Sequence, residues 1–412
     1  MTKQNEKDAK RVPELRFKGF TDDWEQRKLG ETFLFKKNNT FSRSELSFEN
    51  GYVKNIHYGD ILVKYNEYLN VHNNSNIPFV TKNIPSNFSS SYLQDGDIVM
   101  ADTAEDETVG KSTEISSLSS NDRVLAGLHT IPLSPKQKFG SGFLGFYLNS
   151  NSYHDKLRPL MQGIKVTSIS KTNLKNTILQ FPKELEEQKR IGKLFIKLNR
   201  TITLHEEQHR QLERLKKALL QKMFADETGY PALRFKGFTA KWEQRKLGDI
   251  TRRYDNLRVP VTASKRKHGD IPYYGANGIQ DFVSGYTHDG EFILVAEDGA
   301  RDPKNYPVNY VNGKIWVNNH AHVLQGIQGL ANNLFLLNGI KKINIVAYLV
   351  GGSRAKLNAE TLMQLSIKLP SIHEQEKIGQ LFQSLDKTIT LHDKKIQYLK
   401  QLKRGLLQKM FV

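Results

Sequence analysis

Residues 187–224 read EQKRIGKLFIKLNRTITLHEEQHRQLERLKKALLQKMF, and residues 374–411 read EQEKIGQLFQSLDKTITLHDKKIQYLKQLKRGLLQKMF. The two stretches are identical at 21 of 38 positions. In both, apolar residues return every three or four positions, which is the period of an amphipathic helix. At about 1.5 Å per residue, each stretch predicts a helix of roughly 57 Å.

A second pair of repeats lies upstream of these stretches. Residues 15–31 read LRFKGFTDDWEQRKLGE and residues 233–249 read LRFKGFTAKWEQRKLGD, with 14 of 17 positions identical. The chain is therefore two copies of one unit, covering 15–224 and 233–411, each with a basic and aromatic lead, a globular middle and a helical tail. The middles do not repeat, and the first is longer by 31 residues.

The apolar stripe of each tail is narrow and long, so it needs a partner. The nearest matching partner is the other copy, and two equal helices related by a two-fold would lie antiparallel, with their globules at opposite ends. The stripe includes Leu215 in the first tail and Leu402 in the second. His205 and His392 occupy matching stripe positions, where we expect hydrogen bonding that sets the helix register rather than ligand binding.

The middles contain short apolar runs between Gly, Asn, Pro and Asp turns, which indicates strands. The runs are GDILVKY (59–65), GDIVMAD (96–102), HTIPLS (129–134), EFILVAED (291–298), GKIWVNNHAHVL (313–324) and INIVAYLV (343–350). We expect the two middles to share a fold. The predicted fold class is α+β, with two mixed α/β globules separated by two long antiparallel coiled-coil helices in a pseudo-two-fold internal repeat.

Composition limits the function classes. The 412 residues include no cysteine, the start MTKQNEKDAKRVPELRF lacks an apolar signal region, and no run of 18 apolar residues occurs. These features predict a soluble cytoplasmic protein with no membrane span. The net charge of +18 favours a polyanion partner, although an ordinary basic protein would have the same total. The charge is uneven: residues 31–186 are net neutral, whereas the tails carry +6 and +4.

Motifs for chemistry are weak. VGKST at 109–113 resembles the end of a phosphate loop, but Glu105 stands where that loop requires glycine, and no GxGxxG follows a strand. The acidic run 102–107 and the pair His320 and His322 could hold a metal, yet neither has enough spaced ligands. We expect a solvated loop for the first and a hydrogen-bonding surface for the second. The chain is predicted to hold and position rather than to catalyse.

Several motifs together carry a family resemblance. EQKRIGKLF and EQEKIGQLF open the long helices after FPKELE and LPSIHE, and the second globule contains YYGANGI, ILVAEDGA and VNNHAHVL. Over essentially its whole length, the chain resembles the specificity subunit of type I restriction-modification systems. The resemblance implies a non-catalytic subunit with two target recognition domains, each reading one half of an interrupted double-stranded DNA sequence.

The resemblance also implies a domain order and partners. Residues 1–186 would hold the first lead and target recognition domain, 187–224 a central helix, 225–373 a linker with the second lead and target recognition domain, and 374–412 a C-terminal helix. The helices would act as a ruler and dock two modification subunits, which carry S-adenosylmethionine and methylate adenine. Two restriction subunits would use ATP and Mg to translocate and cut. This chain itself would bind no cofactor and no metal.

Candidate DNA contacts are polar residues of turns and strand ends, because base edges are read by amide, guanidinium and similar groups. In the first globule they are Lys54, Asn55, His57, Asp102, Thr103, Lys165, Thr167 and Ser168. In the second they are Tyr273, Tyr274, Asn277, Asp298, Arg301, Asn318, Asn319 and His320. Two other functions stay open: a coiled-coil scaffold that reads no DNA, and a self-sufficient nuclease or methyltransferase.

Overall fold

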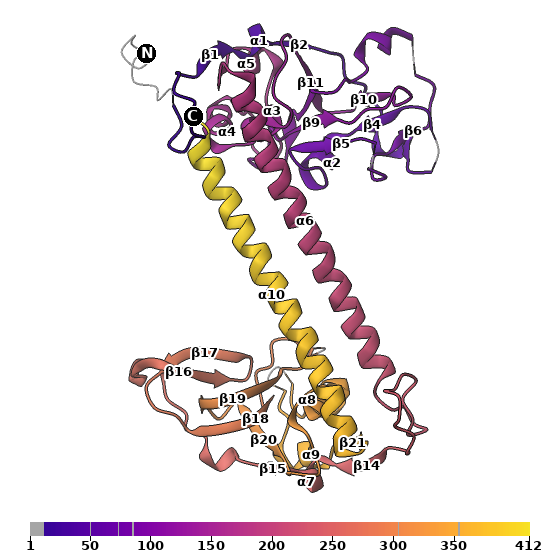
Figure 1. Cartoon of the computed structure of the whole chain (residues 1–412), viewed down its shortest axis with the longest axis vertical. Helices are drawn as coiled ribbons and strands as arrows, with labels where there is room; N and C mark the ends of the chain where they lie inside the picture. Colours follow the sequence, from indigo (N-terminus) through magenta and orange to yellow (C-terminus); the bar gives the residue numbers. More distant parts are fainter. Residues whose placement is uncertain (1–11, 50, 73, 85, 304, 353–354) are drawn as a thin grey trace. The chain divides into compact units, whose positions relative to one another are not determined.

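The computed structural model describes residues 12–49, 51–72, 74–84, 86–303, 305–352 and 355–412; residues 1–11, which open the predicted first domain, lie outside the described residues. By internal contacts the chain forms two units, Met1–His205 with Lys395–Val412, and Glu206–Lys394. The long helices α6 (Leu185–Lys222) and α10 (Ile372–Met410) each contribute to both units (Figure 1). The four-part division expected from the sequence stays a prediction.

The main sheet of the first unit has five strands. Its order is β2 (Phe33–Phe35), β11 (Thr130–Pro135), β7 (Ile98–Ala101), β9 (Ser112–Ser116) and β5 (Tyr68–Asn70). All neighbours are antiparallel except β9 and β5, which are parallel. A second sheet has four strands in the order β10 (Val124–Ala126), β4 (Lys54–Ile56), β6 (Phe79–Val80) and β3 (Leu46–Ser47). A third, two-stranded sheet pairs β12 (Thr167–Ser168) with β8 (Thr103–Ala104). The short helices of this globule are α2 (Tyr58–Val63), α3 (Phe143–Leu148), α4 (Asn151–Leu157) and α5 (Lys171–Lys175).

The sheet of the second unit repeats this order with one more strand. It runs β15 (Thr251–Arg253), β20 (Ala321–Gly326), β18 (His288–Ala296), β19 (Val308–Val317), β16 (His268–Gly275) and β17 (Gly278–Val283). The strand directions also match, because β16 is parallel to β19 as β5 is to β9. The helices α8 (Asn333–Lys342) and α9 (Ala359–Gln364) complete the globule. The expectation that the two middles share a fold is confirmed, although their sequences do not repeat.

The repeated leads form the same small frame in each unit. In the first, β1 (Glu25–Lys28) pairs antiparallel with β13 (Ile178–Phe181), and α1 (Leu29–Thr32) follows. In the second, β14 (Glu243–Lys246) pairs antiparallel with β21 (Ser366–Leu369), and α7 (Leu247–Ile250) follows. The lead therefore joins the last strand of its own globule, directly before the long helix begins.

In the first unit a buried ion pair joins this frame to the start of α6. Arg16 binds the carboxylate of Glu187 through two hydrogen bonds of 2.7 and 2.8 Å, and the Glu187 side chain is 1% exposed. The next side chain, Gln188, accepts from the Gly140 backbone N at 2.9 Å and donates to the Pro182 carbonyl at 2.7 Å. A side chain at Gly192 would lie 2.1 Å from the Ser141 carbonyl oxygen, so the helix can approach the globule this closely only with glycine.

The second unit repeats these contacts at the start of α10. Arg234 holds Glu374 by two hydrogen bonds of 2.7 Å. Gln375 accepts from the Asn332 backbone N at 2.9 Å and donates to the Leu330 and Pro370 carbonyls, both at 3.0 Å. The Arg of the repeated lead and the Glu-Gln of the repeated tail are thus two halves of one interaction, which explains why both are repeated.

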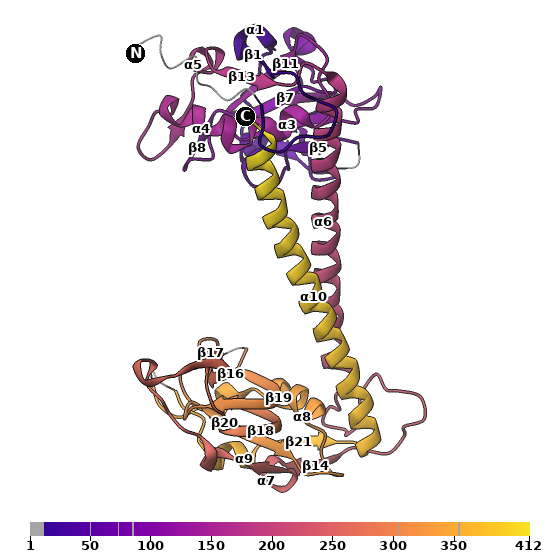
Figure 2. The ribbon, with the colours of Figure 1, turned by 60° about the vertical axis from the view of Figure 1, so that its left-hand side comes forward.

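Each globule core is closed by a phenylalanine from the helix of the other copy. The C-terminal end of α10 lies against the first globule (Figures 1 and 2). Phe411, directly after α10, lies 5.8 Å from Phe143 and 5.7 Å from Phe195, and its ring meets Trp24 edge-on. The Leu15 backbone N also donates to the Lys409 carbonyl at 2.8 Å. All four rings are at most 5% exposed.

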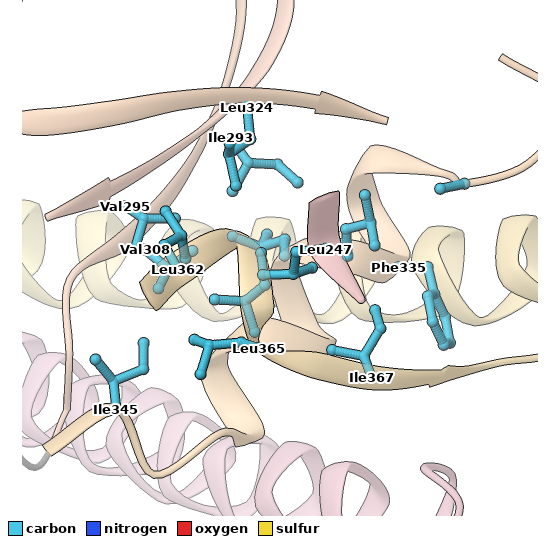
Figure 3. Close-up of a cluster of buried hydrophobic side chains, with 14 of the residues drawn as sticks. Leu247, Ile293, Val295, Val308, Leu324, Phe335, Ile345, Leu362, Leu365 and Ile367 are labelled. Atoms are coloured by element: carbon cyan, nitrogen blue, oxygen red, sulfur yellow. The ribbon is translucent and has the colours of Figure 1, made fainter. Parts of the chain in front are cut away.

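In the second unit Phe224, just after α6, takes the equivalent place. It lies 5.1 Å from Phe335 and 6.0 Å from Phe382, and it meets Trp242 edge-on. The Leu233 backbone N donates to the Lys222 carbonyl at 2.8 Å. Figure 3 shows Phe335 and Ile367 in this core together with Leu247 of the lead. The lead, the globule and the foreign helix end therefore share one core.

Within each unit the two helix segments run antiparallel. In the first unit Ile191 and Phe195 of α6 share a core with Met410 and Phe411, while Ile202, farther along α6, packs in a cluster with Leu399. In the second unit Lys216 of α6 pairs with Asp386 of α10, and Phe224 reaches Phe382. The predicted antiparallel arrangement of the two helices is confirmed within each unit.

The predicted stripe is wrong at two places, because Leu215 is 48% exposed and Leu402 is 39% exposed. Polar contacts supplement the seam: in the first unit Glu67 of the globule accepts from Asn199 of α6 at 2.8 Å and from Lys403 of α10 at 2.6 Å. His205 and His392 are half-buried, and their register role stays a prediction. Among the described residues, no helix is both long and apolar enough to span a membrane.

Two of the predicted strands are wrong. GDILVKY forms the helix α2, because the His57 side chain accepts from the Gly59 backbone N at 3.2 Å and Asp60 lies in the first turn. INIVAYLV forms a single 3₁₀ turn at Ile345–Tyr348. Its apolar residues pack on the core through Ile345, whereas Val346 and Tyr348 are exposed. Apolar runs of this length do not distinguish a strand from a short helix.

We predict that Phe411→Ala destabilises the first unit and Phe224→Ala the second, each by about 3–5 kcal/mol, because each removes a buried ring and leaves a cavity. Proteolysis in increasing urea, with the cleavage sites assigned by mass spectrometry, measures the two units separately. Leu204→Ala and Leu391→Ala are matched controls, since these leucines on the same helices are 52% and 67% exposed. If Phe411→Ala destabilised both units equally, Phe411 would not belong to the core of the first unit alone.

We also predict that the first unit loses stability as the pH rises through neutrality. Glu114 is 3% exposed and accepts from the backbone N of Gly142 at 2.6 Å and Gly145 at 3.0 Å, yet burial raises its pKa to about 7. A raised folded-state pKa gives stability that is full below the unfolded pKa of about 4.5, falls as the pH rises above that value, and is completely lost once the pH exceeds the folded pKa of about 7. The expected loss is about 3 kcal/mol.

The same urea proteolysis, repeated from pH 5 to pH 8, measures this effect. Glu114→Gln should remove most of the pH dependence of the first unit, whereas Glu31→Gln, at an exposed position, should leave it unchanged. A first unit with Glu114→Gln that still loses stability as steeply would show that another group carries the titration.

Candidate nucleic-acid interface

Two neighbouring strands end at an equivalent edge in each globule. In the first, Thr130 of β11 lies opposite Ala101 of β7, so Asp102 follows β7 where His129 precedes β11. In the second, Ala321 of β20 lies opposite Ala296 of β18. The backbone continues each pairing by one bond, from Asp102 N to the His129 carbonyl at 3.1 Å and from Glu297 N to the His320 carbonyl at 2.9 Å. We call these places the strand-end faces.

The first strand-end face brings polar side chains together. Asp102 accepts from the Thr103 hydroxyl at 2.7 Å, and its carboxylate lies 3.4 Å from Nδ1 of His129. The Tyr58 ring stands edge-on to His129, with centroids 5.2 Å apart. His129 has a φ of +53°, in the left-handed region that few residues other than glycine adopt.

A short ribbon extends this face. Thr103 of β8 pairs with Ser168 of β12, and Thr167 pairs with Ala104. The turn before β12 exposes Lys165. Five of the eight residues predicted in the first globule, Asp102, Thr103, Lys165, Thr167 and Ser168, therefore gather around one face.

The other three predicted residues support the fold. Lys54 binds Asp122 at 3.0 Å, and Asn55 is fully buried and donates to the Asn39 side chain at 3.2 Å. His57 is 7% exposed and caps α2; burial, helped by the charge of Arg43, lowers its pKa. In this structure Lys54 and His57 are occupied with protein contacts, and burial keeps Asn55 away from solvent.

The second strand-end face is built around a loop held by Asn277. Its side chain donates to the Gly299 carbonyl and accepts from the Arg301 backbone N, both at 2.9 Å. Nδ1 of His320 lies 2.6 Å from the carboxylate of Asp298. The buried Asn318 side chain accepts from the His320 backbone N at 2.8 Å. Asn319 is exposed beside them. Six of the eight residues predicted in the second globule thus meet here.

The tyrosines of YYGANG lie differently. Tyr273 is 1% exposed, its hydroxyl bonds the Val261 backbone, and Arg266 stacks 4.1 Å above its ring. Tyr274 is half-buried, and burial raises its pKa. Both tyrosines therefore pack within the sheet next to the face and offer little of their side chains to solvent.

An ion network lies beneath the second face. His322 is 1% exposed, and its two ring nitrogens face acceptor oxygens: Nδ1 lies 2.7 Å from the Asp255 carboxylate and Nε2 lies 2.8 Å from the Leu357 carbonyl. Glu297 binds Arg258 at 2.6 Å and Lys356 at 2.8 Å. Burial opposes ionisation of Asp255, but the hydrogen bonds from His322 and the Val323 backbone N outweigh it and lower its pKa.

The two histidines of the NNHAH run, His320 and His322, lie in different environments. His320 precedes the strand and stays at the surface, whereas His322 turns into the core. In the described part of the chain, no three His, Asp or Glu side chains gather closely enough to hold a metal ion.

Sequence reasoning missed His129. A signal was available: DIVMAD and FILVAE align as equivalent strands, and LHTIPLS and NHAHVLQ each place a histidine directly before the partner strand. Arg16 and Arg234 were also missed as partners of the Glu-Gln motif, although both lie in the repeated leads.

Comparison with known proteins places these features in a family. The family described as "Type I restriction modification DNA specificity domain" matches residues 21–214 and 239–401. A putative type I restriction enzyme specificity subunit of Haemophilus influenzae is 43% identical over 143 residues, 35% of this chain and 37% of that protein. The EcoprrI specificity subunit of Escherichia coli is 24% identical over 157 residues, so the matches span little more than a third of the length of these two relatives.

Longer matches have lower identity. A putative MjaX specificity subunit of Methanocaldococcus jannaschii is 22% identical over 336 residues, covering 76% of each chain. The crystal structure of a type I restriction-modification S subunit from M. genitalium superposes with a TM-score of 0.70 at 16% identity, covering 97% of this chain and 99% of that one, and shows the shared fold. Because the family description matches most of the chain in two segments, this chain belongs to the family of type I restriction modification DNA specificity domains and carries two copies of the domain.

Proposed function

We propose that this chain is the specificity subunit of a type I restriction-modification complex and that each globule reads one half of an interrupted sequence in double-stranded DNA. The observation that carries the proposal is the pair of strand-end faces. Their sheets have the same order and their frames nearly the same sequence, whereas their polar side chains differ. Two readers of different half-sites need this combination, because discrimination requires different groups at the base edges.

The charge distribution supports a DNA partner. DNA binding draws on phosphate neutralisation by Lys and Arg, and the net charge of +18 favours it. Residues 31–186 are net neutral, so in the proposal the attraction comes from the helices and the second globule, while the first strand-end face supplies hydrogen-bonding groups. Phosphate contacts would position the complex, and the faces would specify the sequence.

The chemistry belongs to partners in this proposal. The chain would act without a reaction centre of its own and would bind no cofactor. Two modification subunits, docked along the long helices, would use S-adenosylmethionine to methylate adenine, and two restriction subunits would use ATP and Mg. The assembly would work in the cytoplasm. The scaffold alternative is less favoured, because a scaffold does not require two different polar faces in matching frames.

We predict that deleting the gene removes one interrupted, adenine-methylated motif from a genome-wide single-molecule methylation map, with the partner genes unchanged. The reason is that the modification subunits would lose the part that selects their target. Restoring the gene in trans should restore the same motif, which controls for effects on neighbouring genes.

An unchanged map with the partners expressed would contradict the proposed function and favour the scaffold. Methylation or cleavage by the purified chain alone, supplied with S-adenosylmethionine or Mg, would instead favour the self-sufficient enzyme.

A further inference from the structure

We propose that one histidine–carboxylate pair in each strand-end face, His129 with Asp102 and His320 with Asp298, reads the amino group of a base edge by presenting two hydrogen-bond acceptors, the imidazole Nε2 and the carboxylate. The inference rests on the proposed function and identifies the side chains through which each globule would carry it out. It adds a site residue, His129, that was not among the residues predicted from the sequence.

The two histidines occupy the same place in two sheets. Each directly precedes the strand that pairs with the central β7 or β18, and each backbone carbonyl accepts the last hydrogen bond of that pairing. The surrounding sequence of the globules does not repeat. The shared feature is therefore a position in the fold that carries the same side chain.

The carboxylates come from different positions. In the first globule Asp102 immediately follows β7. In the second, the equivalent position holds Glu297, whose carboxylate is already bound to Arg258 and Lys356, and the next residue, Asp298, meets the histidine instead. Both globules thus bring a carboxylate to the histidine, although only in the first does the residue directly after the strand supply it.

The pairs are accessible and leave one imidazole nitrogen unused. The side chains of His129 and His320 are 48% and 47% exposed, and those of Asp102 and Asp298 are 25% and 36% exposed. In each pair Nδ1 is the ring nitrogen nearer the carboxylate, at 3.4 Å in the first face, where the Thr103 hydroxyl also lies 3.5 Å from it, and at 2.6 Å in the second. Because a carboxylate oxygen only accepts hydrogen bonds, Nδ1 can bond it only as a donor, and the Nε2 of a neutral ring is then an acceptor on the other side of the ring. Among the described residues, neither Nε2 has a hydrogen-bond partner.

Other histidines of the globules contrast with these two. His288 uses Nδ1 at the Thr287 hydroxyl and Nε2 at the Tyr254 carbonyl, and His322 is held at both nitrogens. His154 uses Nε2 at the Val109 carbonyl. These imidazoles serve the fold, whereas His129 and His320 keep a ring nitrogen at the surface.

The backbone at both positions is fixed. His129 stands at a φ of +53°, a conformation that costs free energy in residues other than glycine and that concentrates at functional sites. The His320 backbone N is held by the Asn318 side chain, and Asn277 holds the loop that follows Asp298. A fixed imidazole loses little entropy on binding, which favours recognition.

The chemistry of the pair selects a base edge over a phosphate. A carboxylate 2.6–3.4 Å from the imidazole repels a phosphate, because it places negative charge next to negative charge. Base edges in the major groove present acceptors beside amino donors. Carboxylate oxygens accept from the amino group of cytosine or adenine, and so does the Nε2 of a neutral imidazole whose Nδ1 donates to the carboxylate. The pair therefore complements the amino donor of a cytosine or adenine.

The test uses the complex assembled with its partner subunits and a duplex carrying the interrupted motif found in the methylation map. His129→Asn and His320→Asn are the first variants, because asparagine tolerates the left-handed conformation and lacks the outward Nε2. We expect each variant to lose about tenfold in affinity for the full motif. Duplexes altered in one half-site should show the loss of discrimination in one half only, a different half for each variant.

Matched controls are His72→Asn in the first globule and His268→Asn in the second, since both histidines are exposed and lie outside the strand-end faces. Asp102→Asn and Asp298→Asn give a second, independent pair of variants that keeps the size of the side chain. They should lose discrimination in the same half-sites as the histidine variants. The controls should bind as the unaltered complex does.

Two outcomes would overturn the proposal alone: unchanged discrimination in both pairs of variants, or equal weakening on every duplex with a shallower salt dependence, which marks a phosphate contact. An unaltered complex that binds all duplexes equally would overturn the proposed function and this inference with it. The two failures are therefore distinguishable by the unaltered complex.

Discussion

Each globule core is completed by a phenylalanine that follows the long helix of the other repeat, and the rest of the structure depends on this contact. Phe411 completes a core with Trp24 and Phe195, and Phe224 completes the equivalent core with Trp242. Removing a buried aromatic ring costs a few kcal/mol, which is a large share of the stability of a domain. Neither half of the chain therefore contains everything that its own globule requires.

The ion pair between the lead and the start of each long helix explains which parts of the sequence are repeated. The lead arginine and the tail Glu-Gln meet across about 140 to 170 residues, and their side chains are largely buried. A buried charge that loses its partner costs several kcal/mol, so lead and tail must match each other. No such constraint links the frame to the loops of the globule. The frame contacts can therefore stay the same while the strand-end faces differ.

Much of the fold could be predicted from the sequence. The 3.6-residue period gave the long helices, and the repeats gave the two-copy organisation, because both signals extend over many residues. Short apolar runs were less informative: GDILVKY became helical through the cap from His57, which depends on one local hydrogen bond. Leu215 was predicted to pack against the partner helix and is exposed. The amphipathic period alone does not show over what length the two helices stay in contact.

The candidate site was predicted in part. Loop and strand-end residues such as Asp102, Asp298 and His320 do gather, because the ends of neighbouring strands meet at one edge. Asn55 and Tyr273 turned inward instead, where they satisfy backbone and side-chain groups that the sequence does not reveal. His129 was missed although LHTIPLS and NHAHVLQ both place a histidine before the partner strand, because the globules do not repeat in sequence and their equivalent strands have to be aligned first.

Hydrogen exchange of the assembled complex, with and without a duplex carrying its motif, tests most directly whether the strand-end faces meet DNA. The account predicts slower exchange on DNA binding in residues 102–108, 127–130, 297–303 and 318–321. The frame strands β1 and β14 should not change. Protection confined to the long helices, with both faces unaffected, would contradict the account.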